Sequence, residues 1–374
     1  MTSQKKYCDK RLPCGSDDEI QAAFREDGFV VVTNVLTPNE VTAILDELWM
    51  SPRLLGRPGI ERGDPSTWGS GEWPQQQSVG GRNFVNSADV FQDAASWDLT
   101  SHEKLVRLQK MLYGREDIMS ANLGRWGVMR PTVDHPEWKT DESWLHWDQN
   151  PWTEPSFVRL QAIVCLTDNT EKSGGFACVP GFHRSFEQWG KEHPMGSVLV
   201  GGRKADRTYG VNQPFVLPKD DPCQQRVVRV LAPAGSVVVW DSRLPHQNFP
   251  NTDERAMRVV HYTMMKPRDE ESAREHRELL EQKMVVMEVL GITGERFPAF
   301  LTETAREVHC LGTDSIDAVC DRLHVDESLR EAIPLVYEAG EAEERGEVHV
   351  AIKKHQKALR LYPEIEHWYS AILR

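Results

Sequence analysis

The chain has 374 residues and a formal net charge of −13, with 22 acidic against 13 basic residues from Glu270 onward and no basic stripe elsewhere, so nucleic acid is not an expected partner. No apolar run approaches the roughly 18 residues of a membrane-spanning helix, and the N-terminal MTSQKKYCDK lacks the apolar stretch of a signal peptide, so we expect a cytoplasmic protein without a membrane partner. The seven cysteines are scattered and form no CxxC pair, which predicts neither a disulfide framework nor a thiolate zinc site.

The first fifty residues predict a helix, a strand and a second helix. An S-x-x-E pattern from Ser16 and a T-P-x-E pattern from Thr37 are typical of capping boxes, which satisfy free backbone N–H groups at the start of a helix. Residues 29–33 (FVVVT) lie between the two helices and have the composition of a short buried strand.

Residues 51–81 contain mainly Gly, Pro, Trp and Gln, without periodicity. A loop of that length inside a compact domain is either a functional lid or a disordered segment, and Trp68 and Trp73 favour an ordered lid. A T-x-x-E pattern from Thr100 then predicts the start of another helix. The apolar face of this helix would consist of Leu105, Leu108 and Leu112.

The middle of the chain predicts strands that are rich in apolar and β-branched residues and separated by Gly, Pro, Asn and Asp. The predicted strands lie within residues 157–168, 174–183, 226–231, 235–241 and 258–265. Short strands with long polar connections indicate an antiparallel sandwich or jelly roll. We therefore expect an α+β fold in which residues 1–268 form a jelly-roll (double-stranded β-helix, cupin-like) domain with flanking N-terminal helices.

The pattern after about Pro267 is helical, which makes residues 269–374 an acidic helical C-terminal extension. Residues 336–364 resemble one helix pair of a tetratricopeptide repeat. A single repeat of that kind cannot bury its own apolar face. We therefore expect the extension to pack on the body of the protein, on a partner or on a second copy of the chain.

Four histidines are followed two residues later by an acidic residue, so this spacing alone is weak evidence for a metal site. The pairs are His135 and Glu137, His146 and Asp148, His276 and Glu278, and His324 and Asp326. His276 lies in a charged helical run and is expected on a solvated face, Asp326 precedes a helix and is expected to cap it, and His135 lies in a polar loop.

His146 is the histidine that is followed by strands returning a second histidine, because the run GSVVVWDSRLPHQNFPN ends a predicted strand and presents His246 at the mouth of a sheet. Residues two apart on a strand point to the same face, so His146 and Asp148 can bind one ion together with His246. Two imidazoles and one carboxylate are the facial triad of non-haem Fe(II) oxygenases, although zinc can occupy the same ligands.

An arginine lies close to this group in the sequence, since Arg258 begins the predicted strand RVVHYTMM, twelve residues after His246. Its planar fork of donors suits a carboxylate held by two hydrogen bonds, which favours an oxygenase that uses an organic acid as cosubstrate. Arg255 is the alternative candidate for the same role.

These residues resemble the phytanoyl-CoA dioxygenase-like Fe(II)/2-oxoglutarate oxygenases. The likeness lies in the ordered segments LHWDQNPW, VCLTDNTEKSGGFACVPGFHRS, APAGSVVVWDSRLPHQNFPN and RVVHYTM. The resemblance implies that His146, Asp148 and His246 bind iron, and that Arg258 binds the distal carboxylate of 2-oxoglutarate near Asn248. In many relatives the arginine comes one residue earlier, at the position of Met257 here, which keeps Arg255 as an alternative.

The resemblance further implies consumption of O2, conversion of 2-oxoglutarate to succinate and CO2, and oxidation of an unactivated C–H bond in a small-molecule substrate. Hydroxylation is the expected outcome because Asp148 is present, whereas halogenating relatives lack the carboxylate. Desaturation and ring closure remain open. Two alternatives are hydroxylation of a protein side chain and a non-catalytic, cupin-like metal-binding protein.

Several neighbouring residues have a structural and a functional interpretation. His183 is expected to be structural instead of a fourth ligand. Of Trp144, Trp147 and Trp152, we expect two in the core and one facing the substrate. Candidates for binding an acidic group of the substrate are Arg125, Arg130, Arg184 and Arg243.

Overall fold

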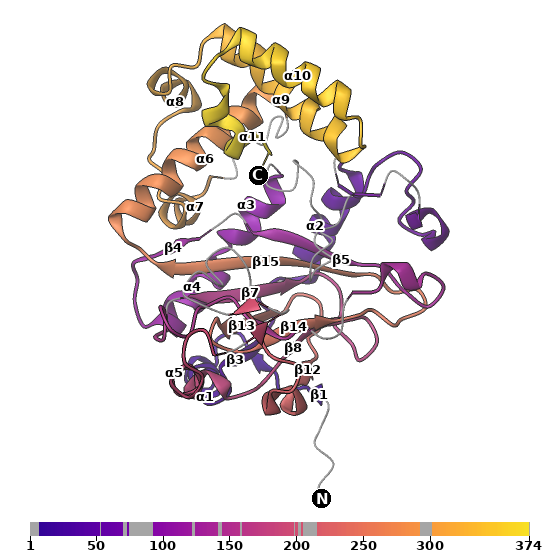
Figure 1. Cartoon of the computed structure of the whole chain (residues 1–374), viewed down its shortest axis with the longest axis vertical. Helices are drawn as coiled ribbons and strands as arrows, with labels where there is room; N and C mark the ends of the chain where they lie inside the picture. Colours follow the sequence, from indigo (N-terminus) through magenta and orange to yellow (C-terminus); the bar gives the residue numbers. More distant parts are fainter. Residues whose placement is uncertain are drawn as a thin grey trace, which may run out of the picture.

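Two β-sheets packed face to face form the centre of the molecule, as the computed structural model shows (Figure 1). The structure describes residues 7–52, 54–69, 73–74, 93–121, 124–140, 144–157, 159–197, 199–200, 203–204, 215–291 and 301–373. The larger sheet has the order β2 (Leu12–Pro13), β3 (Phe29–Thr33), β13 (Val237–Asp241), β7 (Leu160–Cys165), β15 (Arg258–Pro267) and β4 (Ile118–Ser120), and β5 (Arg125–Met129) also pairs with β15. The smaller sheet has the order β1 (Tyr7–Cys8), β12 (Val228–Val230), β8 (Gly175–Cys178), β14 (His246–Phe249), β6 (His146–Trp147) and β11 (Phe215–Val216). The strands β9 (Leu199–Val200) and β10 (Arg203–Lys204) pair with each other.

Alternation of side chains along the strands of the larger sheet produces two apolar layers. In β3, Phe29 and Val31 point into the cluster between the two sheets, and Val30 and Val32 point into a second cluster on the outer face. Because successive side chains of a strand point to opposite faces, a strand buried on both sides has a continuous apolar sequence. This explains the FVVV and VVVW runs, and the jelly-roll prediction is confirmed.

Three helices of the N-terminal region cover the outer face of the larger sheet. They are α1 (Asp17–Asp27), α2 (Pro38–Met50) and α4 (Glu103–Tyr113). The capping box at Thr37 is confirmed, since its hydroxyl accepts from Glu40 N and the Glu40 carboxylate accepts from Thr37 N. The capping box predicted at Ser16 is wrong because its hydroxyl donates to Pro13 O instead.

The helix start predicted at Thr100 is also wrong. Thr100 ends the separate helix α3 (Ala94–Thr100), where its hydroxyl donates to Ser96 O, and α4 has His102 at its N-cap. The expected apolar face of α4 does form, with Leu105 and Leu108 buried.

The segment predicted as a lid, residues 51–81, is described in part. Residues 65–69 form the short helix η1 (Pro65–Gly69), and Trp68 and Trp73 are buried against the outer cluster. Positions 53, 70–72 and 75–81 lie outside the described residues.

The C-terminal helices form a bundle beyond β15, at the end of the molecule opposite to β1 (Figure 1). They are α6 (Glu270–Leu290), α7 (Glu303–Val308), α8 (Ile316–Arg322), α9 (Glu327–Glu344), α10 (Val348–Leu361) and α11 (Tyr369–Leu373). The pair α9 and α10 packs on α6 and α11 around a core of its own, and Trp97 of α3 packs against Met284 and Met287 of α6. The extension therefore lies directly on the body, and Asp326 caps α9 as predicted.

The prediction that His276 lies on a solvated face is wrong. His276 is half-buried, its ring lies 5.8 Å from that of the fully buried His309, and burial lowers the pKa of His276 to about 4. His276 is covered by His309, which directly follows α7, and the periodicity of one helix does not show such a contact.

The remaining elements are the helix α5 (Phe186–Glu192) and the short helices η2 (Pro136–Trp138), η3 (Phe182–Arg184), η4 (Pro222–Arg226) and η6 (Ile365–Trp368). Among the described residues, no helix has both the length and the apolar composition required to cross a membrane.

Candidate metal centre

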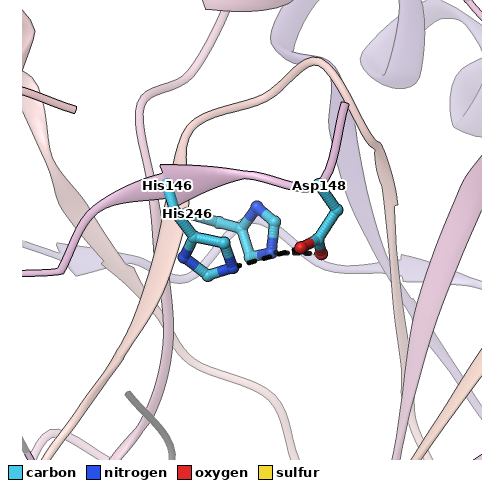
Figure 2. Close-up of side chains that lie close together, drawn as sticks. All are labelled: His146, Asp148 and His246. Carbon is cyan, nitrogen blue, oxygen red and sulfur yellow. Dashed lines mark ion pairs between the residues drawn. The ribbon is translucent and has the colours of Figure 1, made fainter. Parts of the chain in front are cut away.

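His146 and His246 lie opposite each other on neighbouring antiparallel strands. The register of β6 and β14 pairs the two residues directly, and their ring centroids are 4.3 Å apart. Asp148 follows His146 by two residues and points toward the same space, as Figure 2 shows. The period of a strand and the pairing of two strands therefore bring the three side chains together.

The three side chains present their ligand atoms to one point. His146 Nε2 lies 3.5 Å from Asp148 Oδ1, and His246 Nε2 lies 3.5 Å from Asp148 Oδ2. One ligand atom from each residue lies within 4.8 Å of the other two. Two imidazole nitrogens and one carboxylate oxygen on one side of a metal leave the remaining positions open for other ligands, which fits a non-haem Fe(II) centre.

Hydrogen bonds to the backbone orient both imidazoles. His146 Nδ1 lies 3.1 Å from Trp144 O, and His246 Nδ1 lies 2.9 Å from Leu244 O. A carbonyl can only accept, so Nδ1 carries the proton in each ring and Nε2 keeps its lone pair for a metal. Gln161 Nε2 donates to Asp148 Oδ2 at 2.9 Å and holds the carboxylate in place.

The protonation states also suit metal binding. Burial, reinforced by the neighbouring His246, lowers the pKa of His146 to about 4. Burial alone would raise the pKa of Asp148, but the two imidazoles and the hydrogen bond from Gln161 outweigh it and hold that pKa below its usual value. Near neutral pH the centre therefore offers a neutral His146 imidazole and an ionised carboxylate.

Arg258 is fully buried at the start of β15. Its Nε donates to Asn169 Oδ1 at 2.7 Å, and its Nη1 lies 3.5 Å from the Tyr262 hydroxyl and 3.5 Å from Met129 Sδ. Its Nη2 has no hydrogen-bond partner among the described residues, and no described carboxylate pairs with it. A buried charge without a counter-ion is costly, so this geometry fits a site that an anion completes.

The other residues predicted for the cosubstrate lie in different places. Asn248 is buried on β14, and its Oδ1 accepts a hydrogen bond of 3.2 Å from the Tyr262 hydroxyl, which links it to Arg258. Arg255 is exposed in the turn before β15, where its backbone N–H donates to Asp253 Oδ1. The geometry favours Arg258 over Arg255.

A glycine makes room for the Arg258 side chain. A Cβ atom placed on Gly175 would lie 2.9 Å from Arg258 Nε, and the φ angle of Gly175 is +128°. Side chains are excluded there by both contact and backbone conformation.

Three residues of this region were missed in the sequence. Tyr262 lies four positions after Arg258 and so on the same face of β15, and Gln161 is a polar residue inside the apolar strand LQAIVC. Both signals were readable, because a strand places alternate residues on one face. Asn169 could not be recognised from the sequence pattern, because it lies in the loop after β7 and not on a strand.

Two of the three tryptophans pack in the core, and one contacts a metal ligand. Trp147 packs among Phe186 and Trp189, and Trp152 donates from Nε1 to Gly190 O and His193 O. Trp144 stacks on His146, with ring centroids 4.6 Å apart and an interplanar angle of 14°. Trp144 is therefore the tryptophan next to the metal ligands.

His183 and two of the candidate arginines serve structural roles. His183 Nε2 lies 3.2 Å from Arg25 O, and its ring fills the space beside Gly28. Arg243 forms an ion pair with Asp241 at 2.6 Å. Arg130 lies between the rings of Trp73 and Trp138, 4.6 and 4.0 Å from their centroids.

Comparison with known proteins identifies a family and several relatives of the chain. The family model of phytanoyl-CoA dioxygenase (PhyH) matches residues 24–260. A putative phytanoyl-CoA dioxygenase of Dictyostelium discoideum is 23% identical over 259 residues, which cover 61% of this chain and 69% of that protein. The ectoine dioxygenase of Bordetella parapertussis is 27% identical over 240 residues, which cover 63% of this chain and 70% of that protein. Among solved structures, the epimerase SnoN in complex with Fe3+, alpha ketoglutarate and nogalamycin RO has 20% identity and a TM-score of 0.43, over 67% of this chain and 83% of that chain.

The fold and the three ligands define a non-haem iron oxygenase with a two-histidine, one-carboxylate centre. The family match covers more than half of the chain. The chain belongs to the phytanoyl-CoA dioxygenase family, whose members use Fe(II), 2-oxoglutarate and O2.

Proposed function

We propose that the protein oxidises an unactivated C–H bond of a small-molecule metabolite, with hydroxylation as the outcome. The observation that carries this proposal is the pairing of a complete metal-ligand set with a buried arginine whose Nη2 has no partner among the described residues. The ligand set alone would suit a zinc site as well. The arginine adds a place for an organic acid next to the metal, which favours an oxygenase that uses 2-oxoglutarate.

When bound, the iron supplies O2 activation coupled to decarboxylation of 2-oxoglutarate to succinate and CO2. His146, Asp148 and His246 would hold it, with Gln161 fixing the carboxylate. We assign the distal carboxylate of 2-oxoglutarate to Arg258, whose guanidinium is already oriented by Asn169. Preformed donors of this kind lose little freedom on binding.

We assign Asn248 to the same subsite through Tyr262, whose hydroxyl donates to it and lies beside Arg258 Nη1. A carboxylate on Nη2 would then lie next to a hydroxyl and an amide that orient one another. Such networks rigidify a buried polar site when each member has a partner.

Anaerobic titration with Fe(II) and 2-oxoglutarate tests the proposal. We expect a visible absorption band in the wild type that is lost in His146→Ala. In a separate assay with O2 present, Fe(II)-dependent succinate formation should fall at least about a hundredfold in the same variant. His135→Ala is a matched control, because His135 has the same spacing to an acidic residue but lies partly exposed in a loop. Absence of the band in the wild type would contradict the proposal.

Hydroxylation of a protein side chain is less well supported. The sequence feature that supported it was the repeat-like helix pair. In the structure the extension's own helices cover the apolar face of that pair, α9 and α10, so this face does not support a protein substrate. We also propose that residues 1–268 form the catalytic domain and residues 269–374 an extension. In support, β15 ends at Pro267, α6 begins at Glu270 and the family match ends at residue 260.

A further inference from the structure

The two imidazoles of the centre are held alike by the backbone but have different side chains beside them. In each case Nδ1 meets the carbonyl of the residue two positions earlier, which is Trp144 for His146 and Leu244 for His246. Trp144 and Leu244 therefore hold equivalent positions. Because a leucine serves this backbone contact at His246, the contact does not require an aromatic side chain, and the indole of Trp144 has another role.

The indole of Trp144 lies nearly flat on the imidazole of His146. The ring centroids are 4.6 Å apart and the planes differ by 14°. The aromatic neighbours of His246 are oriented differently, since the ring of Trp240 lies 5.2 Å away at 59° and that of Phe176 lies 5.8 Å away at 31°. Of these three rings, that of Trp144 is the one stacked on a ligand.

The main chain and the side chain of Trp144 make separate contacts. Its backbone N–H donates to Gln247 Oε1 at 3.3 Å, and its carbonyl accepts from His146 Nδ1 at 3.1 Å. The indole Nε1 is buried and has no hydrogen-bond partner in the part of the chain that the structure describes, although buried indoles usually have one. We therefore attribute the position of the ring to the stack, which a side-chain substitution can remove while both main-chain bonds remain.

We propose that Trp144 is a positioning residue that raises the affinity of the centre for its metal ion by stacking on His146. This inference rests on the metal centre of the proposed function. An imidazole that binds a dication becomes electron-poor, and the face of an indole is electron-rich, so the stack is more favourable in the metal-bound state. The stack also limits rotation of the imidazole, whose Nε2 has to point toward the same space as the carboxylate of Asp148.

Titration with Co(II) in the absence of 2-oxoglutarate tests the inference, with the visible absorption of the bound ion as the readout. An aromatic stack changes a dissociation constant by roughly 2- to 12-fold. Trp144→Leu should therefore raise the Kd of Co(II) about fivefold or more relative to the wild type. Trp144→Phe should keep the Kd within threefold, because a phenyl ring restores the stack.

Trp138→Leu is the matched control, because Trp138 also stacks on a histidine that is not one of the three ligands. Its ring centroid lies 3.9 Å from that of His135, and the planes differ by 13°. This variant should bind Co(II) like the wild type. A loss of affinity as large as that of Trp144→Leu would show that removing a stacked tryptophan acts through the fold, and would overturn the inference.

The comparison of leucine with phenylalanine at position 144 decides whether the aromatic ring matters. Equal Kd values in Trp144→Leu and Trp144→Phe would overturn the inference, because the ring would then have no effect or would act only through its size. Circular dichroism spectra check that the variants fold, and Trp144→Met takes the place of Trp144→Leu if the latter does not.

The wild type separates this inference from the proposed function. If the wild type bound neither Co(II) nor Fe(II), the metal centre itself would fail. Binding in the wild type that is lost in His146→Ala but unchanged in Trp144→Leu would leave the proposed function intact and remove only the role of Trp144.

Discussion

The indole of Trp126 donates a hydrogen bond of 3.1 Å from Nε1 to the carboxylate of Asp93. Asp93 is the N-cap of α3 and accepts from Ser96 N, whereas Trp126 is the neighbour of Arg125 on β5. Because α3 packs against α6, this bond joins the strand that carries Arg125 to the part of the body that contacts the C-terminal extension.

Asp93 should make stability depend on pH. Burial raises the pKa of Asp93 to about 7, even though the hydrogen bonds from Trp126 and Ser96 favour the charged form. The folded state then binds one more proton than the unfolded state between about pH 4 and pH 7, so this contribution to stability is lost as the pH rises through that window.

Asp93→Asn has one side-chain acceptor instead of two and cannot accept from both Ser96 N and Trp126 Nε1, so it should cost about 1–3 kcal/mol of stability at pH 4. Relative to the wild type the variant should gain stability as the pH rises to 8, because only the wild type then carries a buried charge. Urea denaturation at the two pH values measures the difference. Asp269→Asn, at the exposed N-cap of α6, is the control and should give no gain. An equal change in stability at both pH values would contradict the assignment.

Arg258→Gln should raise the Kd of 2-oxoglutarate roughly 30-fold or more, because removing one member of a buried charge pair costs about 2 kcal/mol at least. Arg255→Gln carries the same substitution three positions earlier on an exposed turn and should bind 2-oxoglutarate like the wild type. Anaerobic absorption titration with Fe(II) distinguishes them. Equal losses in both variants would contradict the choice of Arg258.

Gly175→Ala should weaken 2-oxoglutarate binding about tenfold, because displacing a well-placed charge-assisted donor costs on the order of 1–2 kcal/mol. The added methyl group would meet Arg258 Nε at 2.9 Å. Gly196→Ala separates this effect from backbone strain, because Gly196 also has a positive φ but nothing within 4 Å of its Cβ position. If both variants lost affinity equally, the contact with Arg258 would not be the cause.

Lys283 should lower the free energy of unfolding relative to an apolar residue at the same position. It is 3% exposed on α6, and burial lowers its pKa to about 7. Between pH 7 and about 10.4 the unfolded state binds one more proton than the folded state. The free-energy cost of burying the charged amine is therefore full below pH 7 and disappears as the pH rises through that window.

Lys283→Met should accordingly stabilise the protein by about 1–3 kcal/mol at pH 7 and by much less at pH 10. Lys353→Met, on the exposed face of α10, should change little at either pH. Chemical denaturation curves provide the comparison. A gain of the same size at both pH values would show that packing, and not charge burial, is responsible.

The sequence predicted the metal ligands better than their surroundings. His146 and Asp148 share a face because of the period of a strand, and the strand that ends at Asp241, shortly before His246, was recognisable from its own composition. The errors at Thr100 and His276 have a different origin. Thr100 satisfies a capping pattern but belongs to the preceding helix, and His276 is covered by an element from another part of the chain. Patterns within one element do not contain such contacts.

The direct pairing of His146 with His246 has a consequence for how this chain can diverge. Only the register between β14 and the two residues of β6 sets their separation. A slip of one residue would turn His246 away from Asp148 and bring Gln247 in its place. The residues from 149 to 245 can therefore gain or lose length in their loops without disturbing the iron ligands, as long as this one register is kept. Variation in those loops can therefore accumulate while the metal-binding geometry stays the same.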